Sequence, residues 1–225
     1  KNTPTILAIG LLILFMAIPI MCYSTTSHFS NNYLTYKSEL DKFRQLNKKT
    51  NTNDISFTAK KSTLGEIYIV VIGESLNREH MHLYGYHRAT TPHLDSLNEL
   101  GELIAFENVF SNHTHTTQTL SMVLTEKNQY NTVRNNIAPS IINVLNTANV
   151  ETHWVSNQVR YGVWDNAVGV IADNADNKIY HNKYVGKTFK NKNYDEILID
   201  DIHTILAKKS TNNRVIFVHL IGNHW

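Results

Sequence analysis

The sequence has almost no cysteine, since Cys22 is the single one in 225 residues. One cysteine excludes a disulfide within this chain and a zinc site built from several thiolates. A dominant charge of one sign is also missing, because 21 Lys and Arg face 19 Asp and Glu, and the basic residues form no dense block. A nucleic-acid-binding surface needs concentrated positive charge, so that class of function is not supported.

Charge is also absent from a stretch near the N-terminus, Ile6 to Tyr23, which reads ILAIGLLILFMAIPIMCY. At about 1.5 Å per residue, a helix of this length nearly crosses a hydrocarbon core of roughly 30 Å. We therefore expect a transmembrane helix over residues 1–23, as the last of several spans. A cleaved signal peptide is disfavoured because no small-x-small cleavage site follows Cys22, and a soluble core helix would normally show a polar face.

Residues 24–63 are polar and rich in Asn, Thr, Ser and Lys. Within them, Asn32 to Leu46 has the weak amphipathic pattern of a juxtamembrane helix, and Asn47 to Ser62 has the composition of a linker. We expect the folded domain to occupy residues 64–225. The chain starts without Met and stops at Trp225, directly after a strand-like run, so we expect it to be a fragment with this domain truncated.

Strands and helices are expected to alternate within residues 64–225. Apolar runs predict strands at Ile67–Ile72, Phe106–Phe110, Glu151–Val155 and Arg214–Ile221. Helices are predicted from Thr91-Pro92, over Thr116–Leu124, from Pro139 and over Tyr194–Lys208. This alternation predicts an α/β fold with a mainly parallel sheet sandwiched by helices, in which the first apolar run is a central strand.

Polar residues follow three of the predicted strands. Glu74 follows the first, Ser156-Asn157-Gln158 follows Glu151–Val155, and Gly222-Asn223-His224 follows the last. A lone Glu after a strand is usually a helix cap or a solvated residue. In open α/β sheets, however, ligands bind beyond the carboxyl ends of the strands, so the three groups together predict a site at that edge.

A threonine-rich cluster, Ser111 to Gln118, leads into the helix predicted over Thr116–Leu124 and includes its first residues. Capping is the usual role of such residues. A hydroxyl at a helix start also meets free N–H groups that favour a phosphate, and a divalent metal held by Glu74 would activate Thr116 as a nucleophile. Zinc normally takes about four ligands, so Glu74 and Thr116 make an incomplete set.

The sequence contains 12 histidines, and two of them, His113 and His115, flank Thr114 in this cluster. On a strand, this spacing would put both imidazoles on one face and allow them to bind a metal ion. In a loop the spacing carries little information. We therefore expect His113 and His115 to line the substrate pocket rather than to bind the catalytic ion.

Several segments together resemble the bacterial phosphoethanolamine transferases, which are membrane-anchored members of the alkaline phosphatase and sulfatase superfamily. The resemblance rests on Ile72-Gly73-Glu74-Ser75, Arg78, His80, Tyr84-Gly85, Arg88 to Pro92, Leu94, Asn108-Val109, Ser111 to Thr125, Trp154 to Gln158, and His219 to His224. It covers the expected anchor and essentially all of residues 64–225. These residues would then form the N-terminal part of a sulfatase-like catalytic domain.

The resemblance implies a role for each matching residue. Glu74 corresponds to the zinc-binding carboxylate, and Thr116 to the nucleophile, which also ligates zinc. His224 corresponds to a histidine that contacts the substrate phosphate or a second zinc ion. Asn157 and Gln158 correspond to polar contacts of the phosphoethanolamine group. The family completes its zinc site with an Asp-His pair, which is expected after Trp225.

The resemblance also implies an activity and a location. Phosphoethanolamine would move from phosphatidylethanolamine, through a phospho-threonine, to lipopolysaccharide or lipooligosaccharide, on the periplasmic side of the bacterial inner membrane. Relatives that act on lipid A usually carry a cysteine near the nucleophile, where Asn112 stands here, so the branch that modifies core sugars is favoured. A phosphoglycerol transferase or hydrolase of the same superfamily, and a non-catalytic membrane-anchored zinc-binding domain, remain as alternatives.

Overall fold

The computed structural model describes residues 57–133, 138–160, 166–182, 184–185, 188–189 and 193–222, together with Ser27, Ser30 and Leu34. The chain divides into two units, Lys1–Lys49 and Thr50–Trp225. The fold described below belongs to the second unit. The predicted transmembrane helix lies outside the described residues, and so does most of the predicted juxtamembrane helix. In the part of the chain that is described, no helix has the length and apolar character needed to cross a membrane.

A four-stranded sheet forms the centre of the second unit. Its strands lie in the order β1-β6-β2-β3, and all three pairings are parallel. The strands are β1 (Ile67–Ile72), β2 (Glu151–Val159), β3 (Asn177–Asn182) and β6 (Arg214–His219). A separate antiparallel pair is formed by β4 (Tyr184–Val185) and β5 (Thr188–Phe189). The prediction of a mainly parallel sheet is therefore confirmed.

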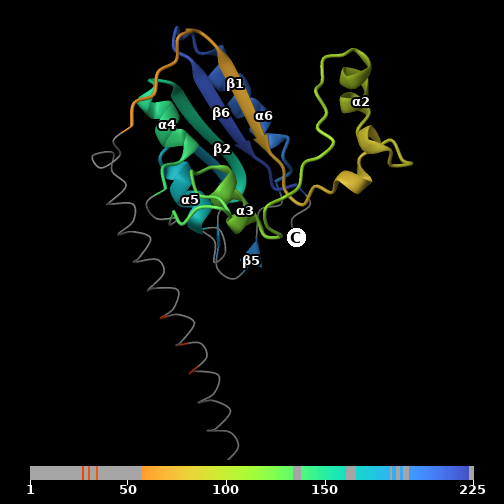
Figure 1. The fold of residues 1–225 in the computed structure, drawn as a ribbon, viewed down its shortest axis with the longest axis horizontal. Helices are drawn as coiled ribbons and strands as arrows, with labels where there is room; N and C mark the ends of the chain where they lie inside the picture. The colour runs from red at the N-terminus through yellow and green to blue at the C-terminus, as the bar shows by residue number, and fades with distance from the viewer. Residues whose placement is uncertain are drawn as a thin grey trace, which may run out of the picture. The chain divides into compact units, whose positions relative to one another are not determined.

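Helices cover both faces of this sheet (Figure 1). Because side chains alternate along a strand, β6 directs Val215 and Phe217 to one face and Ile216 and Val218 to the other. The first face packs against α3 (Thr116–Val123), α4 (Ile141–Thr147) and α5 (Asn166–Asp173), and the second against α6 (Ile197–Ala207). The predicted sandwich of helices around the sheet is confirmed.

Among the described residues the strand β1 lies at an edge of the sheet, so the prediction that Ile67–Ile72 is a central strand is wrong for this part of the chain. Five of its six residues remain 38–61% exposed. A continuous apolar run predicts a strand of a parallel sheet, but it does not identify the strand's neighbours. The central position belongs to β6, all of whose residues are buried.

Other elements differ from the predictions in extent. No strand forms at Phe106–Phe110, where the three large apolar side chains are 64–84% exposed and no strand within the described ranges offers hydrogen bonds. The helix predicted from Pro139 begins at Ile141, because Ser140 and Asn143 form a capping box that satisfies its first N–H groups. The strand β2 continues four residues beyond Val155, and α5, β3 and the β4–β5 pair had no predicted counterpart.

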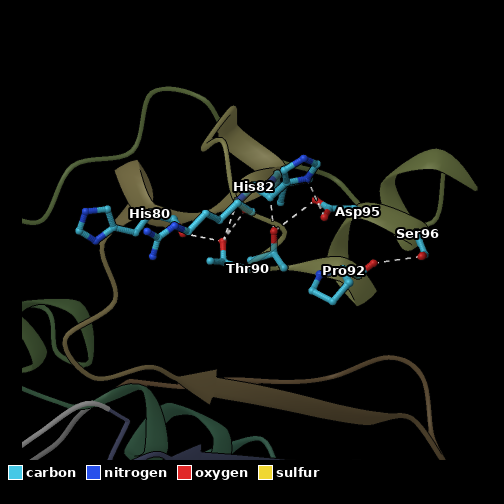
Figure 2. A network of polar contacts seen from close by, with 9 residues as sticks. His80, His82, Thr90, Pro92, Asp95 and Ser96 are labelled. Carbon is cyan, nitrogen blue, oxygen red and sulfur yellow. Dashed lines mark hydrogen bonds and ion pairs between the residues drawn. The ribbon is translucent and has the colours of Figure 1, made fainter.

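The residues between β1 and α3 include η1 (Arg78–His80), η2 (His82–Tyr84) and α2 (Pro92–Glu99). Two threonine hydroxyls join η1 and η2 to α2, and Figure 2 shows Thr90 beside His80 and His82. Thr90 Oγ1 accepts from the N–H of His82 (3.1 Å), and Thr91 Oγ1 accepts from the N–H of Leu83 (2.9 Å). Asp95 of α2 contacts both the Thr91 hydroxyl (3.2 Å) and His82 Nδ1 (2.9 Å). The threonines of the Arg88 to Pro92 motif therefore hold this segment together.

Two valines paired in register across β1 and β6 test whether β1 is an exposed edge strand and β6 a buried central strand. Val71 is 61% exposed and its neighbour Val218 is 3% exposed. Val218→Ala removes buried methyl groups and leaves a cavity, so it should lower the free energy of unfolding by about 2 kcal/mol. Val71→Ala should change it by less than about 0.5 kcal/mol. Urea unfolding of both variants gives the comparison, and equal losses would show that the edge strand is buried in solution.

Candidate functional site

The candidate site is built around a contact between Thr116 and Glu74. The Thr116 hydroxyl donates a hydrogen bond to Glu74 Oε2 over 2.9 Å, and the Ser75 hydroxyl donates to Glu74 Oε1 over 3.1 Å. Glu74 stands just past the end of β1, and Thr116 is the first residue of α3. Both are half-buried. The structure therefore brings together the carboxylate and the hydroxyl that the sequence paired.

The hydroxyl of Thr116 does not act as a helix cap. The residue at the N-cap of α3 is His115, whose backbone is extended and whose side chain makes no capping hydrogen bond. The Thr116 hydroxyl points out of the helix to Glu74. It lies beside the first N–H groups of α3, which carry the positive end of the helix dipole. This position suits a hydroxyl that is to meet a phosphate group.

His113 and His115 lie on the exposed loop before α3, with ring centroids 5.6 Å apart. The backbone N–H of His115 donates to His113 Nδ1 over 3.2 Å. The Thr114 hydroxyl lies 3.0 Å from His115 Nδ1. Each ring therefore has Nδ1 engaged within the loop. No structural observation tests their predicted place in a substrate pocket, so that role stays a prediction.

Asn157 and Gln158 lie inside β2 and are buried. The Asn157 amide donates to Asn193 O (2.9 Å) and to Asp195 Oδ1 (3.0 Å), and its oxygen accepts from Asn182 Nδ2 (3.2 Å). Gln158 Nε2 donates to Leu220 O over 2.8 Å. Both N–H groups of the Asn157 amide thus have protein partners. The predicted contact of these residues with phosphoethanolamine is untested, and the observed contacts are with neighbouring segments of the chain.

The third strand-end group is described only in part. Gly222 follows β6 in the left-handed region, with φ of 52°. Asn223 and His224 lie outside the described residues. The predicted contact of His224 with a substrate phosphate or a second zinc ion therefore stays a prediction.

Two residues at this edge of the sheet were not predicted as site residues. His219, the last residue of β6, is 4% exposed and stacks edge-on against Trp154, with ring centroids 5.6 Å apart. Among the described residues, its Nε2 has no hydrogen-bond partner. Burial lowers the pKa of His219 to about 4, although the negative charges of Glu74 and Asp195 oppose this shift. The imidazole is therefore neutral at pH 7.

Asp195, just before α6, is the second of these residues. Its carboxylate accepts from the N–H groups of Ile221 (2.8 Å) and Gly222 (2.9 Å), in addition to Asn157. In the sequence, Asp195 falls in the first turn of the helix predicted over Tyr194–Lys208, where an acidic residue is common. The motif His219 to His224 already pointed to the segment that Asp195 holds, but the contact itself had no signal in the sequence.

The donor atoms present suit a hard or borderline divalent cation such as zinc. A carboxylate and a hydroxyl within 2.9 Å of each other can face one ion, and they provide half of a tetrahedral set. Among the described residues, no group of three or more His, Cys, Asp and Glu side chains could hold a metal ion. Glu74 and Thr116 therefore fit zinc as two of its ligands.

Comparison with known proteins points to one family. The Sulfatase family matches residues 66–225. The phosphoethanolamine transferase CptA of Salmonella typhimurium is 30% identical over 202 residues, which cover 87% of this chain and 34% of that protein. Phosphoethanolamine transferase EptC of Escherichia coli K12 is 29% identical over 199 residues, with the same coverage of 87% and 34%. The chain thus spans about a third of the length of these relatives.

A solved structure agrees with this family and with the fold. The C-terminal periplasmic domain of EptC from Escherichia coli, solved as a complex with Zn, superposes with a TM-score of 0.66 and 30% sequence identity. The superposition covers 75% of this chain and 47% of that domain. The resemblance to the phosphoethanolamine transferases is therefore confirmed, together with the sulfatase-like fold.

The buried neutral His219 predicts a loss of stability in acid. Above its ordinary pKa of 6.5 the imidazole is neutral in both states. Below that pH the unfolded chain binds a proton that the folded chain does not bind until about pH 4, so unfolding becomes easier. Between pH 7.5 and pH 5, His219 alone should lower the free energy of unfolding by about 2 kcal/mol.

Urea unfolding of the wild type and of His219→Gln at both pH values checks this prediction. Burial also lowers the pKa of His153, so His219→Gln should reduce the acid-induced loss rather than abolish it. An identical loss in the two proteins would contradict the assignment to His219.

Proposed function

The chain belongs to the sulfatase family, and from that premise we propose that it is a phosphoethanolamine transferase with Thr116 as nucleophile. The donor is phosphatidylethanolamine, and the acceptor is a lipopolysaccharide or lipooligosaccharide. The observation that carries the proposal is the 2.9 Å hydrogen bond from the Thr116 hydroxyl to the Glu74 carboxylate, in a chain whose relatives are phosphoethanolamine transferases.

The reaction has two transfers of the same phosphoryl group. Thr116 Oγ1 first attacks the phosphorus of the donor, the bond from phosphorus to the glycerol oxygen breaks, and diacylglycerol leaves with a proton. An acceptor hydroxyl or phosphate then attacks the phospho-threonine. The bond from phosphorus to Thr116 breaks, and Thr116 regains a proton. Thr116 Oγ1 is therefore the attacking atom in the first transfer and the leaving atom in the second.

The contacts of Thr116 explain how it would be prepared for attack. Its hydroxyl already donates to Glu74 Oε2, which directs the proton away from the helix axis and leaves an oxygen lone pair for phosphorus. Zinc held by Glu74 and Thr116 would lower the pKa of the hydroxyl and compensate phosphate charge. The first N–H groups of α3 lie beside the phosphate in this arrangement and stabilise its negative charge.

The location follows from the proposed donor. Phosphatidylethanolamine is a membrane lipid, so the catalytic domain must work at a membrane surface. A transmembrane helix over residues 1–23 would hold it there, with the domain on the periplasmic side of the inner membrane. The absence of cysteine from residues 64–225, with Asn112 beside the nucleophile segment, favours core sugars over lipid A as the acceptor.

Substitution of the nucleophile tests the proposed chemistry. Thr116→Ala removes the attacking oxygen, so both phospho-threonine formation and transfer should fall at least 1000-fold, as expected when a covalent nucleophile is removed. Full-length protein incubated with phosphatidylethanolamine labelled in its head group would be digested and examined by mass spectrometry. Thr204→Ala, which changes an exposed threonine on α6, is the matched control and should keep wild-type labelling.

Two outcomes would decide against parts of this proposal. Wild-type acceptor labelling by Thr116→Ala would exclude Thr116 as the nucleophile. Labelling from phosphatidylglycerol, but not from phosphatidylethanolamine, would instead indicate a phosphoglycerol transferase.

Metal binding provides a second test that does not depend on turnover. Glu74→Gln replaces a charged ligand by a neutral amide, so the zinc dissociation constant should rise by at least tenfold. Competition with a chromogenic chelator measures that constant in the full-length protein. Glu79→Gln, in the exposed η1 turn, is the control and should bind zinc like the wild type. Unchanged affinity in Glu74→Gln would remove Glu74 from the metal site.

A further inference from the structure

The segment that follows β6 is held by hydrogen bonds at three consecutive residues, Leu220, Ile221 and Gly222, which we call the β6 exit turn. The N–H of Leu220 donates to Ile72 O of β1 over 3.0 Å. The carbonyl of Leu220 accepts from Gln158 Nε2 over 2.8 Å. The N–H groups of Ile221 and Gly222 both donate to the Asp195 carboxylate. Four polar groups of this short turn therefore have partners on other elements.

Asp195 makes the charged part of this contact. Its Oδ1 accepts from Ile221 N and from Asn157 Nδ2, and its Oδ2 accepts from Gly222 N, all within 2.8–3.0 Å. Hydrogen bonds to a carboxylate are stronger than those between neutral groups. Asn157 is completely buried, and Asn182 holds its amide in turn, so the Asp195 carboxylate is fixed from the side of β2. One carboxylate thus connects the start of α6, the end of β2 and the β6 exit turn.

The exit turn lies directly against the backbone of Glu74. A Cβ added at Gly222 would overlap the Glu74 carbonyl oxygen and would lie 3.2 Å from its carbonyl carbon and from its Cβ. Only glycine permits this approach, and the φ of 52° at Gly222 is also one that other residues rarely adopt. The position of Gly222 therefore limits where the main chain of Glu74 can lie.

These contacts form a continuous path from Asp195 to the reactive hydroxyl. Asp195 holds the N–H of Gly222, Gly222 packs on the Glu74 backbone, and the Glu74 carboxylate accepts from Thr116. We propose that Asp195 is a positioning residue that, through Gly222, keeps Glu74 at hydrogen-bonding distance from Thr116. This role rests on the proposed function, in which Glu74 and Thr116 bind zinc and Thr116 attacks phosphorus. Displacement of a metal ligand by a fraction of an ångström is enough to reduce catalysis.

Asp195→Asn is the variant that tests this role with the least change of shape. It keeps one acceptor oxygen, but it removes the charge and turns an NH₂ group toward one of the two N–H donors of the exit turn. Asp200→Asn is the matched control, because Asp200 is an exposed residue of the same helix, in the first turn of α6. Gly222→Ala acts at the other end of the path, where the added Cβ must displace the Glu74 backbone.

The first measurement needs neither metal nor substrate. Hydrogen–deuterium exchange, followed by mass spectrometry or NMR on the full-length apoprotein, reports the protection of the Ile221 and Gly222 amides. Asp195→Asn should accelerate their exchange at least tenfold, while Asp200→Asn should leave it unchanged. Thermal unfolding of the same samples shows whether the variant is folded. If Asp195→Asn does not fold, Gly222→Ala takes its place in the comparison.

The second measurement concerns the site itself. Partners that orient metal ligands typically contribute 10- to 100-fold to metal affinity or activity, so Asp195→Asn should weaken zinc binding by about that factor. We also expect kcat for transfer to fall more than KM for the donor rises, because Asp195 positions the reacting groups and does not contact the lipid. Gly222→Ala should show the same pattern, and Asp200→Asn should match the wild type in both quantities.

The outcomes separate this proposal from the proposed function. A folded Asp195→Asn protein with wild-type zinc affinity and kcat, despite faster exchange at the exit turn, would overturn the positioning role and leave the transferase assignment intact. Unchanged exchange would overturn the hydrogen bonds on which the role depends. A wild-type protein that neither binds zinc nor forms phospho-threonine would instead overturn the proposed function.

Discussion

The strand β6 pairs in parallel with β1 on one side and with β2 on the other, and the candidate site depends on this shared direction. His219, the last residue of β6, lies opposite Ile72 of β1 and Ser156 of β2. Parallel strands end at the same edge of a sheet, so segments that are far apart in the sequence leave the sheet side by side. Glu74, the end of β2 and the β6 exit turn meet for that reason.

The nucleophile reaches this edge by a different route. Between β1 and α3 the chain forms the turns and helix that Thr90, Thr91 and Asp95 hold together, and it then returns to the sheet. Near its other end, α3 buries Leu120 in the core, and Leu124 directly after it is buried as well. One short helix is therefore anchored by apolar packing near its end and presents Thr116 to Glu74 at its start.

Polar side chains occupy the carboxyl-terminal part of the sheet, where apolar ones would pack with less cost. His219 is buried without a partner for Nε2 among the described residues, and Asn157 is buried with its amide bonded to three residues from two neighbouring segments. A buried polar group that has its hydrogen bonds costs little, and it restricts its neighbours to one arrangement. The apolar residues Trp154-Val155 of β2 and Val215–Val218 of β6 therefore stabilise the core, and the polar residues that follow them in each strand position the neighbouring segments.

The elements with local sequence signals could be predicted before the fold was considered. The apolar runs predicted β1 and β6, the threonine-rich helix start predicted α3, and the chemistry of a carboxylate and a hydroxyl selected Glu74 and Thr116 before any contact was known. Family motifs then assigned roles to these two residues, and the comparisons agree with the family.

The contacts between distant segments could be identified only from the three-dimensional fold. A run such as Phe106–Phe110 has strand-forming residues, but no neighbouring strand offers it hydrogen bonds among the described residues. Likewise, nothing near Asn157 in the sequence indicates that its amide binds Asp195, or that Asp195 in turn holds Ile221 and Gly222. Strand order and side-chain partners depend on residues brought together from distant parts of the chain. Local sequence patterns do not specify which of these residues come into contact.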